Sequence, residues 1–293
     1  MRRRVSISCC AVALAALAVV PGCSRKAADE PPVATPSVSL NHDKVPIGSP
    51  VKLTYKFTVA SNAPDIIKGQ DYMVFVHVLD PTGEQLWTDD HPPVPATSTW
   101  KPGQTVEYTR TVFVPNYPYI GEAAIRMGLY SPASGKRLTL SAQQASRKEY
   151  VVGKFQLLPQ SENIFLIYKD GWHPAEVSPD NAASEWQWTK KTATISFRNP
   201  KKDVTFYLEW DARPDLFTPP QNVTLALGGQ PIGAFKADNR DKRMMMFPIT
   251  AAQLGTGDMG ELVISVDRTF TPGRGDTREL GIRIFHAFVE SRS

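Results

Sequence analysis

The sequence predicts an all-β protein with two tandem β-sandwiches, the first immunoglobulin-like and the second jelly-roll-like, behind an N-terminal leader and a flexible tether. Period-two alternation of apolar and polar side chains recurs along the chain, broken about every ten residues by Gly, Pro, Asn and Asp. Outside the leader, no apolar helical periodicity of about ten residues or more occurs. About 257 residues remain after the tether, which favours two domains.

The leader predicts export. Three arginines precede an apolar run from Val5 to Val20, which is shorter than the roughly 20 residues that a membrane-spanning helix needs. The following stretch, VPGC, ends at Cys23 and resembles the lipobox of bacterial lipoproteins, although Pro21 stands where that family usually has a small residue. The resemblance implies a signal peptide over residues 1–22 and lipid attachment at Cys23. The alternative is an ordinary cleaved signal with a chance cysteine.

Removal of the leader would change both the cysteine count and the charge. Cys9 and Cys10 would leave with it, so Cys23 would be the only cysteine and no intramolecular disulfide would form. The formal net charge would fall from +4 to about +1, which leaves no basic surface for nucleic acid. Acyl chains on Cys23 would anchor the chain in a lipid bilayer. By the same resemblance, Ser24 in place of Asp favours the outer membrane, with the chain facing the periplasm or the cell surface.

Residues 23–36 are polar and contain several prolines, which predicts a flexible tether, and residues 37–159 form the predicted immunoglobulin-like sandwich. Turn sequences such as PIGSP, DPTG and WKPGQ separate its strands. The expected strands are Ser37–Leu40, Val51–Val59, Tyr72–Asp80, Glu84–Asp89, Thr105–Val114, Glu122–Tyr130, Lys136–Thr139 and Tyr150–Leu158.

The alternating pattern restarts after LLPQSEN, so residues 160–293 form the predicted jelly-roll-like sandwich. The sequence ITAAQL predicts a helical turn at Thr250–Leu254. The expected strands are Ile164–Tyr168, Ser184–Thr189, Ala193–Phe197, Val204–Trp210, Val223–Leu227, Ile232–Lys236, Arg243–Pro248, Glu261–Asp267 and Leu280–Val289.

The segment VFVHVLDPTGEQLWTDDHPP is rich in His and Asp, and its DPTG turn predicts a hairpin with a three-residue loop. That register places His77 opposite Trp87 with Asp89 diagonal, and it separates His77 from His91 by roughly 13 Å along the sheet. Two histidines so far apart cannot hold one metal ion at about 2 Å. We therefore expect His77, Trp87 and Asp89 to form a local structural cluster and expect no metal site.

A second group of candidate residues is aromatic. Trp186 and Trp188 alternate in EWQW and fall on one strand face, and Trp172 lies upstream in GWHPAE with Glu176. Flat indole rings beside carboxylates and amides can hold sugar rings, so these four residues are the candidate ligand-binding set. The alternative is that the tryptophans are the buried face of a sandwich strand.

Catalytic patterns are missing from the sequence. There is no G-x-S-x-G, C-x-x-C, H-E-x-x-H or Walker motif, so we expect neither a cofactor nor catalysis. A glycosidase would need two carboxylates facing each other across a cleft. The candidates by residue type alone are Glu176, Glu185, Asp211 and Asp276.

Longer stretches of both halves carry a family resemblance. The segments VFVHVLDPTGEQLWTDDHPP, GEAAIRMGLYSPASGKRL, EWQWTKKTATISFRNP and DTRELGIRIFHAFVE resemble the periplasmic β-rich modules associated with bacterial dolichyl-phosphate-mannose-type membrane glycosyltransferases. Those modules have no assigned catalysis, and the membrane-embedded catalytic part has no counterpart here. The resemblance implies a non-catalytic envelope protein that binds or scaffolds an envelope protein or glycan, linked to surface polysaccharide. The alternatives are a carbohydrate-binding module that uses the tryptophans and an envelope hydrolase that uses the carboxylates.

Overall fold

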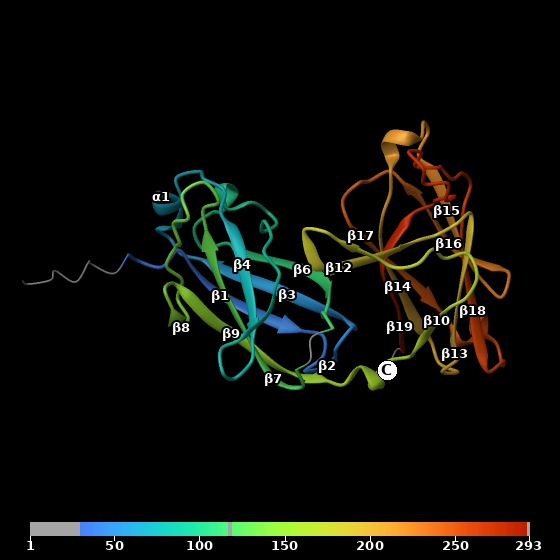
Figure 1. The fold of residues 1–293 in the computed structure, drawn as a ribbon. Coiled ribbons are helices and arrows are strands. Elements are labelled where there is room, and N and C mark those ends of the chain that lie inside the picture. The colour runs from blue at the N-terminus through green and yellow to red at the C-terminus, as the bar shows by residue number, and fades with distance from the viewer. Residues whose placement is uncertain (1–29, 117–118, 292–293) are drawn as a thin grey trace, which may run out of the picture. The chain divides into compact units, whose positions relative to one another are not determined.

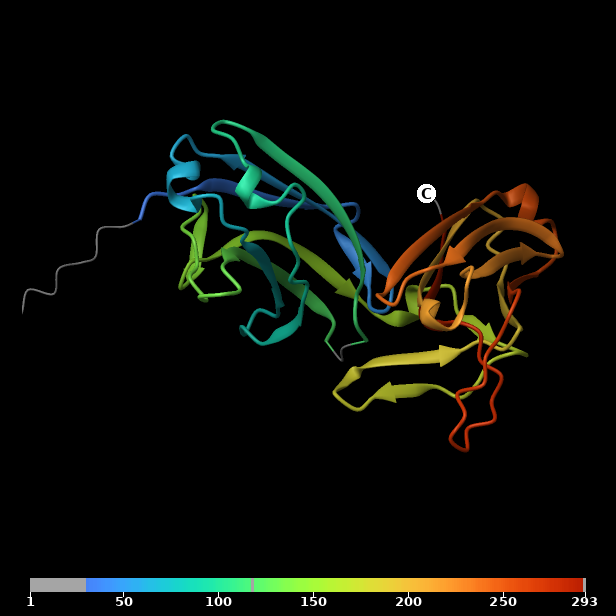
Figure 2. The ribbon, with the colours of Figure 1, turned by 90° about the horizontal axis from the view of Figure 1, so that it is seen from above.

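The predicted fold class is confirmed: the protein is all-β and contains two successive β-sandwiches (Figures 1 and 2). The immunoglobulin-like and jelly-roll-like topologies stay predictions. The computed structural model describes residues 30–116 and 119–291. The described residues from Pro32 onward form one compact unit, in which each sandwich has its own hydrophobic core.

The first sandwich pairs a three-stranded sheet with a six-stranded sheet. The three-stranded sheet is antiparallel and has the order β1 (Ala34–Leu40), β3 (Pro50–Val59) and β6 (Thr105–Phe113). The second sheet has the order β2 (Lys44–Pro46), β9 (Glu149–Leu158), β7 (Gly121–Tyr130), β4 (Met73–Leu79) and β5 (Gln85–Thr88), and β8 (Gln143–Ser146) also pairs with β9. The β2–β9 pairing is parallel, and the other strand pairings described in this sandwich are antiparallel.

Alternation along the strands builds the first core. Along β3, Leu53, Tyr55 and Phe57 point inward and are buried, whereas the residues between them are partly or fully exposed. The first strand starts at Ala34, three residues earlier than expected, so the predicted tether is shorter by that amount. Val33 and Ala34 are buried there, and the following Pro36 is tolerated because β1 is an edge strand.

The predicted register of the β4–β5 hairpin is wrong by one residue. His77 pairs with Thr88 and Val78 with Trp87, because a β-bulge between Val78 and Leu79 leaves one extra residue on β5. His91 consequently lies opposite Val74, on the opposite sheet face from His77. The conclusion that the two histidines cannot share a metal survives the corrected register.

The second sandwich contains two five-stranded sheets. One has the order β10 (Leu166–Tyr168), β13 (Thr192–Arg198), β18 (Met259–Val266), β15 (Gln221–Leu227) and β16 (Gln230–Ala237). The other has the order β11 (Glu176–Ser178), β12 (Asn181–Trp188), β19 (Arg283–Ser291), β14 (Val204–Asp211) and β17 (Arg243–Ile249). All pairings in both sheets are antiparallel.

The helical elements are short. The predicted turn at Thr250–Leu254 is confirmed as α2 (Ala251–Leu254), which begins with a capping box in which Thr250 and Gln253 bond each other's backbone N–H groups. The sequence did not predict α1 (Ala63–Ile67), nor the short strands β2, β8 and β11. The other helical turns are η1 (Thr97–Thr99), η2 (Gln160–Glu162) and η3 (Pro214–Leu216).

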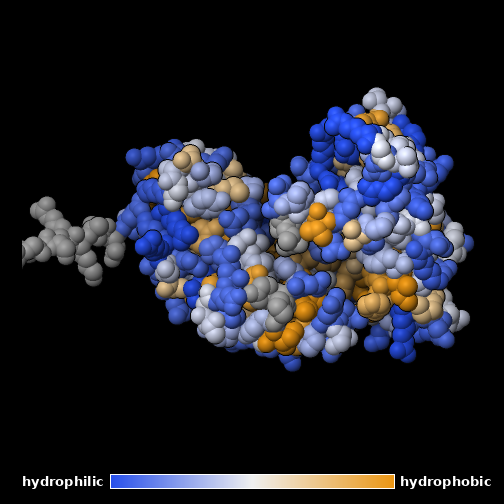
Figure 3. All heavy atoms as spheres, viewed as in Figure 1, coloured by the Kyte–Doolittle hydropathy of each residue, from blue (hydrophilic) through white to orange (hydrophobic). Residues whose placement is uncertain are grey.

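The predicted strand Lys136–Thr139 is reduced to a single bridge between Arg137 and Tyr130. Across the described residues, no helix is long and apolar enough to cross a membrane. The face seen in Figure 3 is largely hydrophilic, with hydrophobic residues gathered in small groups. The cores of the two sandwiches are separate in sequence, and the domain boundary near residue 159 stays a prediction.

Candidate functional site

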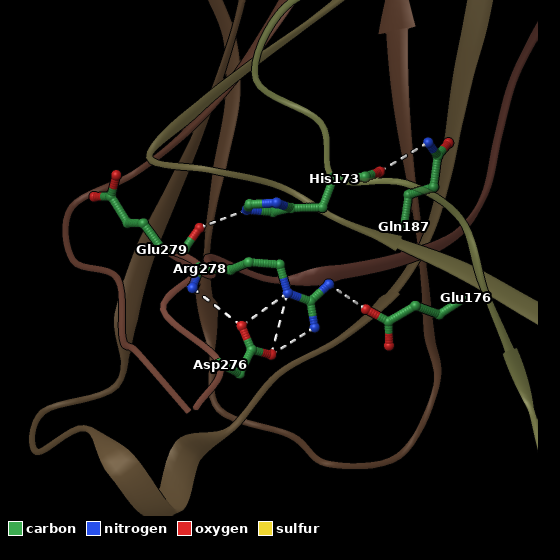
Figure 4. Close-up of polar contacts among 6 residues, drawn as sticks. All are labelled: His173, Glu176, Gln187, Asp276, Arg278 and Glu279. Atoms are coloured by element: carbon green, nitrogen blue, oxygen red, sulfur yellow. Dashed lines mark hydrogen bonds and ion pairs between the residues drawn. The ribbon is translucent and has the colours of Figure 1, made fainter. Parts of the chain in front are cut away.

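An arginine joins two segments of the second sandwich that are distant in sequence (Figure 4). Arg278 lies in the loop before β19, and its Nη1 donates to Glu176 Oε1 at 2.5 Å, across 102 residues of sequence. Its Nε and Nη2 donate to the carboxylate of Asp276 at 2.7–3.1 Å. We call Glu176, Asp276 and Arg278 the arginine clamp, because it attaches the loop to the β11–β12 hairpin.

The clamp keeps the carboxyl group of Asp276 ionised. The hydrogen bonds from Arg278 lower the pKa of Asp276 to about 2. The same bonds, to Asp276 first and to Glu176 second, raise the pKa of Arg278. Asp276 therefore carries no proton to donate near neutral pH, which removes it as a general acid. The clamp can orient the hairpin, and its geometry does not suit acid catalysis.

A buried histidine anchors the same hairpin. His173 Nε2 donates to the backbone oxygen of Glu279 at 2.8 Å, and Gln187 Nε2 donates to the backbone oxygen of His173 at 3.1 Å (Figure 4). These bonds tie β12 to the segment that precedes β11 and to the loop that carries Arg278. The base of the hairpin is thus held from both sides.

The two tryptophans of β12 share one strand face, as the alternation predicts, but differ in environment. Trp188 is only 8% exposed and packs edge-on against Phe270, with ring centroids 5.5 Å apart. Trp186 is half-buried, and its indole Nε1 has no hydrogen-bond partner. Arg283 lies over both rings, at 5.1 Å from the Trp186 centroid and 5.5 Å from that of Trp188. The pair is therefore not an exposed double platform, and only Trp186 remains accessible.

Trp172 is placed apart from that pair. Its Nε1 donates to the backbone oxygen of Thr194 at 2.9 Å, and its ring meets Tyr168 edge-on at 4.8 Å. Trp172 is half-buried and packs against the second core. The structure therefore does not join the three predicted tryptophans into one surface.

A cleft opens where the hairpin leaves the sheet. Strand β12 pairs with β19 only at Gln187 and Trp188, so the rest of β12 diverges, and Figure 2 shows the hairpin projecting from the sandwich. The residues of this sandwich that line the cleft include Tyr168, Glu185, Trp186, Gln187, Phe285 and His286. We call these six residues the hairpin cleft. Within the described part of the chain, the exposed side chain of Glu185 makes no hydrogen bond or ion pair.

Three residues of the hairpin cleft were not predicted from the sequence. Tyr168 ends β10 and is exposed, whereas Phe285 and His286 lie next to each other on β19. Adjacent strand residues normally point to opposite faces, but a bulge opposite Glu209 and Trp210 disturbs β19 at this point. No pattern in the sequence reveals that bulge.

The remaining candidate carboxylates for a hydrolase are each bound to an arginine and do not face one another across a cleft. Asp211 is buried and paired bidentately with Arg283; burial raises its pKa and the arginine opposes the rise. Glu176 and Asp276 do come together, but on one guanidinium. Among the described residues, no group of three or more His, Cys, Asp or Glu side chains is placed to hold a metal ion.

The three residues of the predicted hairpin cluster, His77, Trp87 and Asp89, each contact different partners. His77 donates to Glu149 at 3.4 Å, on one sheet face. Asp89 receives two bonds from Arg110, at 3.0 and 2.7 Å, and one from Tyr55 at 3.1 Å. Trp87 packs edge-on against Phe155 at 6.0 Å. Cys23 and the predicted signal peptide lie outside the described residues.

Comparisons with known proteins reveal weak structural likenesses. No protein-family model and no curated protein matches the chain. The CBM36-1 domain of a xylanase from the hindgut metagenome of Trinervitermes trinervoides is 8% identical, with a TM-score of 0.28, over 45% of this chain and 98% of that one. A β-glucuronidase of Bacteroides uniformis is 9% identical, with a TM-score of 0.31, over 88% and 30%.

A third structure, the CBM51-2 and INT domains of Clostridium perfringens ZmpB in complex with GlcNAc, is 11% identical. Its TM-score is 0.25, over 87% of this chain and 41% of that one. Likenesses at these scores do not carry the ligands or activities of those proteins over to this chain. Its function has to be argued from its own residues.

Proposed function

We propose that this protein is a non-catalytic glycan-binding lipoprotein of the bacterial envelope, anchored at Cys23, and that the hairpin cleft binds the glycan. The observation that carries the proposal is the composition of that cleft. Aromatic rings of Tyr168, Trp186 and Phe285 stand beside the polar groups of Glu185 and Gln187. A concave surface with apolar rings and a few polar groups suits a sugar, which has both apolar C–H faces and hydroxyl groups.

The state of the carboxylates supports binding over hydrolysis. Asp276 is held ionised by Arg278, and Asp211 is buried under Arg283. Glu185 remains as one accessible carboxylate in the cleft, where it can accept hydrogen bonds from sugar hydroxyls. A glycosidase would require a second carboxylate across from it.

The envelope location is supported by the sequence alone. The arginine-led apolar leader and the VPGC stretch favour lipidation and export, and Ser24 favours the outer membrane. The resemblance to modules associated with membrane glycosyltransferases favours a role beside surface polysaccharide. The protein partner, if the chain scaffolds one, would be another envelope component.

The test uses the full chain purified in detergent and a panel of neutral oligosaccharides. We expect Trp186→Ala to weaken binding of the best ligand by at least about fivefold, because a stacked ring contributes about 1 kcal/mol beyond its buried area. Trp87→Ala is the matched control: Trp87 is also half-buried but lies on the first sandwich. Equal affinities for Trp186→Ala and wild type, or release of reducing ends by the wild type, would contradict the proposal.

A further inference from the structure

A cluster of cationic side chains lies on the outward face of the six-stranded sheet of the first sandwich. Strands β4, β7 and β9 are neighbours there (Figure 1), and cross-strand pairing places His77 beside Arg126. Glu149 begins β9 on the same face, and Arg137 follows β7 in the next loop. We call His77, Arg126, Arg137 and Glu149 the cation cluster.

The contacts in the cluster are long for ion pairs. Glu149 Oε1 is 3.4 Å from His77 Nδ1 and 4.0 Å from Arg126 Nη1, and its Oε2 is 3.9 Å from Arg137 Nη1. Neither arginine is within normal hydrogen-bond distance of Glu149 through these atoms, although a guanidinium usually meets a carboxylate at about 2.7–2.9 Å. Two guanidinium groups and one imidazole therefore surround a single carboxylate at long distances, and donors of the two arginines remain available to a second acceptor.

Arg126 is the least satisfied member. Its side chain donates no hydrogen bond to any residue in the described ranges, and its Nε is shielded from solvent without a partner. A buried donor that is left unpaired is costly, more so on a charged group. The side chain keeps 28% of its surface exposed, so an acceptor from solution can reach it.

Arg137 is held in place from two sides. Its guanidinium carbon lies 4.2 Å from the centroid of buried Phe75, a cation–π contact, and its Nη1 donates to the backbone oxygen of Arg147 at 3.2 Å. The ring fixes the plane of the guanidinium beside Glu149. An arginine positioned in this way loses little side-chain entropy on binding a ligand.

The local charge is unbalanced. Arg126 and Arg137 carry two permanent positive charges beside the single carboxylate of Glu149. On the same sheet face, exposed Lys154 pairs with exposed Glu122 at 2.7 Å, one charge against one. The cation cluster therefore carries one more permanent positive charge than negative charge.

We propose that the cation cluster binds an oxyanion carried by a glycan, such as the carboxylate of an acidic sugar, with Arg126 as the main contact. The inference rests on the proposed glycan-binding function and adds to it the charge of the ligand and a second contact surface. The anion would accept hydrogen bonds from Arg126 and Arg137, beside His77. No covalent step is involved.

The test is isothermal titration of the full chain in detergent with a galacturonic acid oligosaccharide, and with its fully methyl-esterified form as the neutral probe. We expect the acidic form to bind at least about tenfold more tightly than the ester, and Arg126→Gln to lose at least about tenfold. Arg126→Lys should retain part of the affinity. Lys154→Gln, which removes one positive charge from the same sheet face, should stay within about twofold of wild type.

Several outcomes would overturn the inference. These are equal affinity for the acid and the ester, unchanged affinity in Arg126→Gln, and equal losses in Arg126→Gln and Lys154→Gln, which would indicate a diffuse charge effect. Binding of inorganic sulfate without binding of either oligosaccharide would assign the site to a free anion and overturn the inference as well. Because Arg126→Gln could fold poorly, unfolding temperatures of all variants are compared first.

The two proposals can fail separately. If Trp186→Ala binds the acidic oligosaccharide as wild type does while Arg126→Gln does not, the cation cluster stands and the hairpin cleft fails. The opposite result is that neutral oligosaccharides bind to the wild type but not to Trp186→Ala, while Arg126→Gln binds all probes as the wild type does. In that case the hairpin cleft stands and the cation cluster fails.

Discussion

The residue with the most restrictive environment is a histidine in the first sandwich that has no place in either proposed site. His91 is 2% exposed; its Nδ1 donates to the backbone oxygen of Asp89 at 2.7 Å. Its Nε2 must then accept from the hydroxyl of Tyr108, at 2.8 Å. The neutral tautomer that carries its proton on Nδ1 therefore satisfies both ring nitrogens.

That arrangement predicts sensitivity to acid. Burial lowers the pKa of His91, Arg110 lowers it further, and Asp89 and Asp90 oppose the shift. The unfolded chain then binds more protons than the folded one as the pH falls below about 6.5, so stability falls with it. Urea unfolding at pH 7.5 and 5.5 should show this loss in the wild type and a smaller one in His91→Gln. His42→Gln, at an exposed histidine, should behave as wild type; equal slopes in all three proteins would refute the prediction.

At the residue scale, the sequence indicated which residues were candidates for the site but not which residues they contact. It identified Glu176 and Asp276 as candidate carboxylates, and the structure attaches both to Arg278. The contact from Asp276 to Arg278 spans two residues and could be expected from the loop sequence. The contact to Glu176 spans 102 residues and depends on which strands become neighbours, which local patterns do not encode.

The secondary-structure elements were largely predictable because most strands have one apolar face. Strands β3, β7, β14 and β18 were all expected within a few residues of their observed bounds. The errors have two physical causes. Strands as short as β2 and β11, with three residues each, do not show a recognisable alternation of apolar and polar side chains. The bulge in the β4–β5 hairpin changes the strand pairing and has no sequence signature.

Glycines inside strands illustrate the same limit and give a prediction. At Gly128 in β7, a side chain would overlap the ring of Phe75 and come 2.7 Å from the backbone oxygen of Lys148. At Gly153 in β9, the nearest atom would be 3.6 Å away, an ordinary contact. Gly128→Ala should therefore lower the free energy of unfolding by about 1–3 kcal/mol, whereas Gly153→Ala should leave it unchanged or slightly higher. Equal urea midpoints for the two variants would contradict this difference.

At the scale of the whole molecule, the structure confirms the all-β class. Each sandwich gathers its own core from strands spread over more than a hundred residues, which the length and the repeated alternation predicted. The membrane anchor depends on Cys23, for which the fold provides no information. It is the part of the proposal that rests entirely on the leader sequence.

Anchoring predicts a clear fractionation result. Cys23→Ser should not be lipidated and should leave the membrane pellet, because it lacks acyl chains that contribute about 0.8 kcal/mol per buried CH2. Mass spectrometry of the wild type should find the lipid on an N-terminal peptide that begins at Cys23. Persistence of the variant in the pellet, with an unmodified wild-type cysteine, would show that something other than lipid holds the protein there.

The arginine clamp has a consequence for the hairpin cleft. Its three charged groups are each about one-third exposed, so dissolved ions weaken their attraction. Strand β11 bonds only to β12, and the Arg278–Glu176 contact restrains it from the other side. Ionic strength therefore acts as a control on how firmly the hairpin is held. The cleft would respond to the salinity of its surroundings even when its ligand carries no charge.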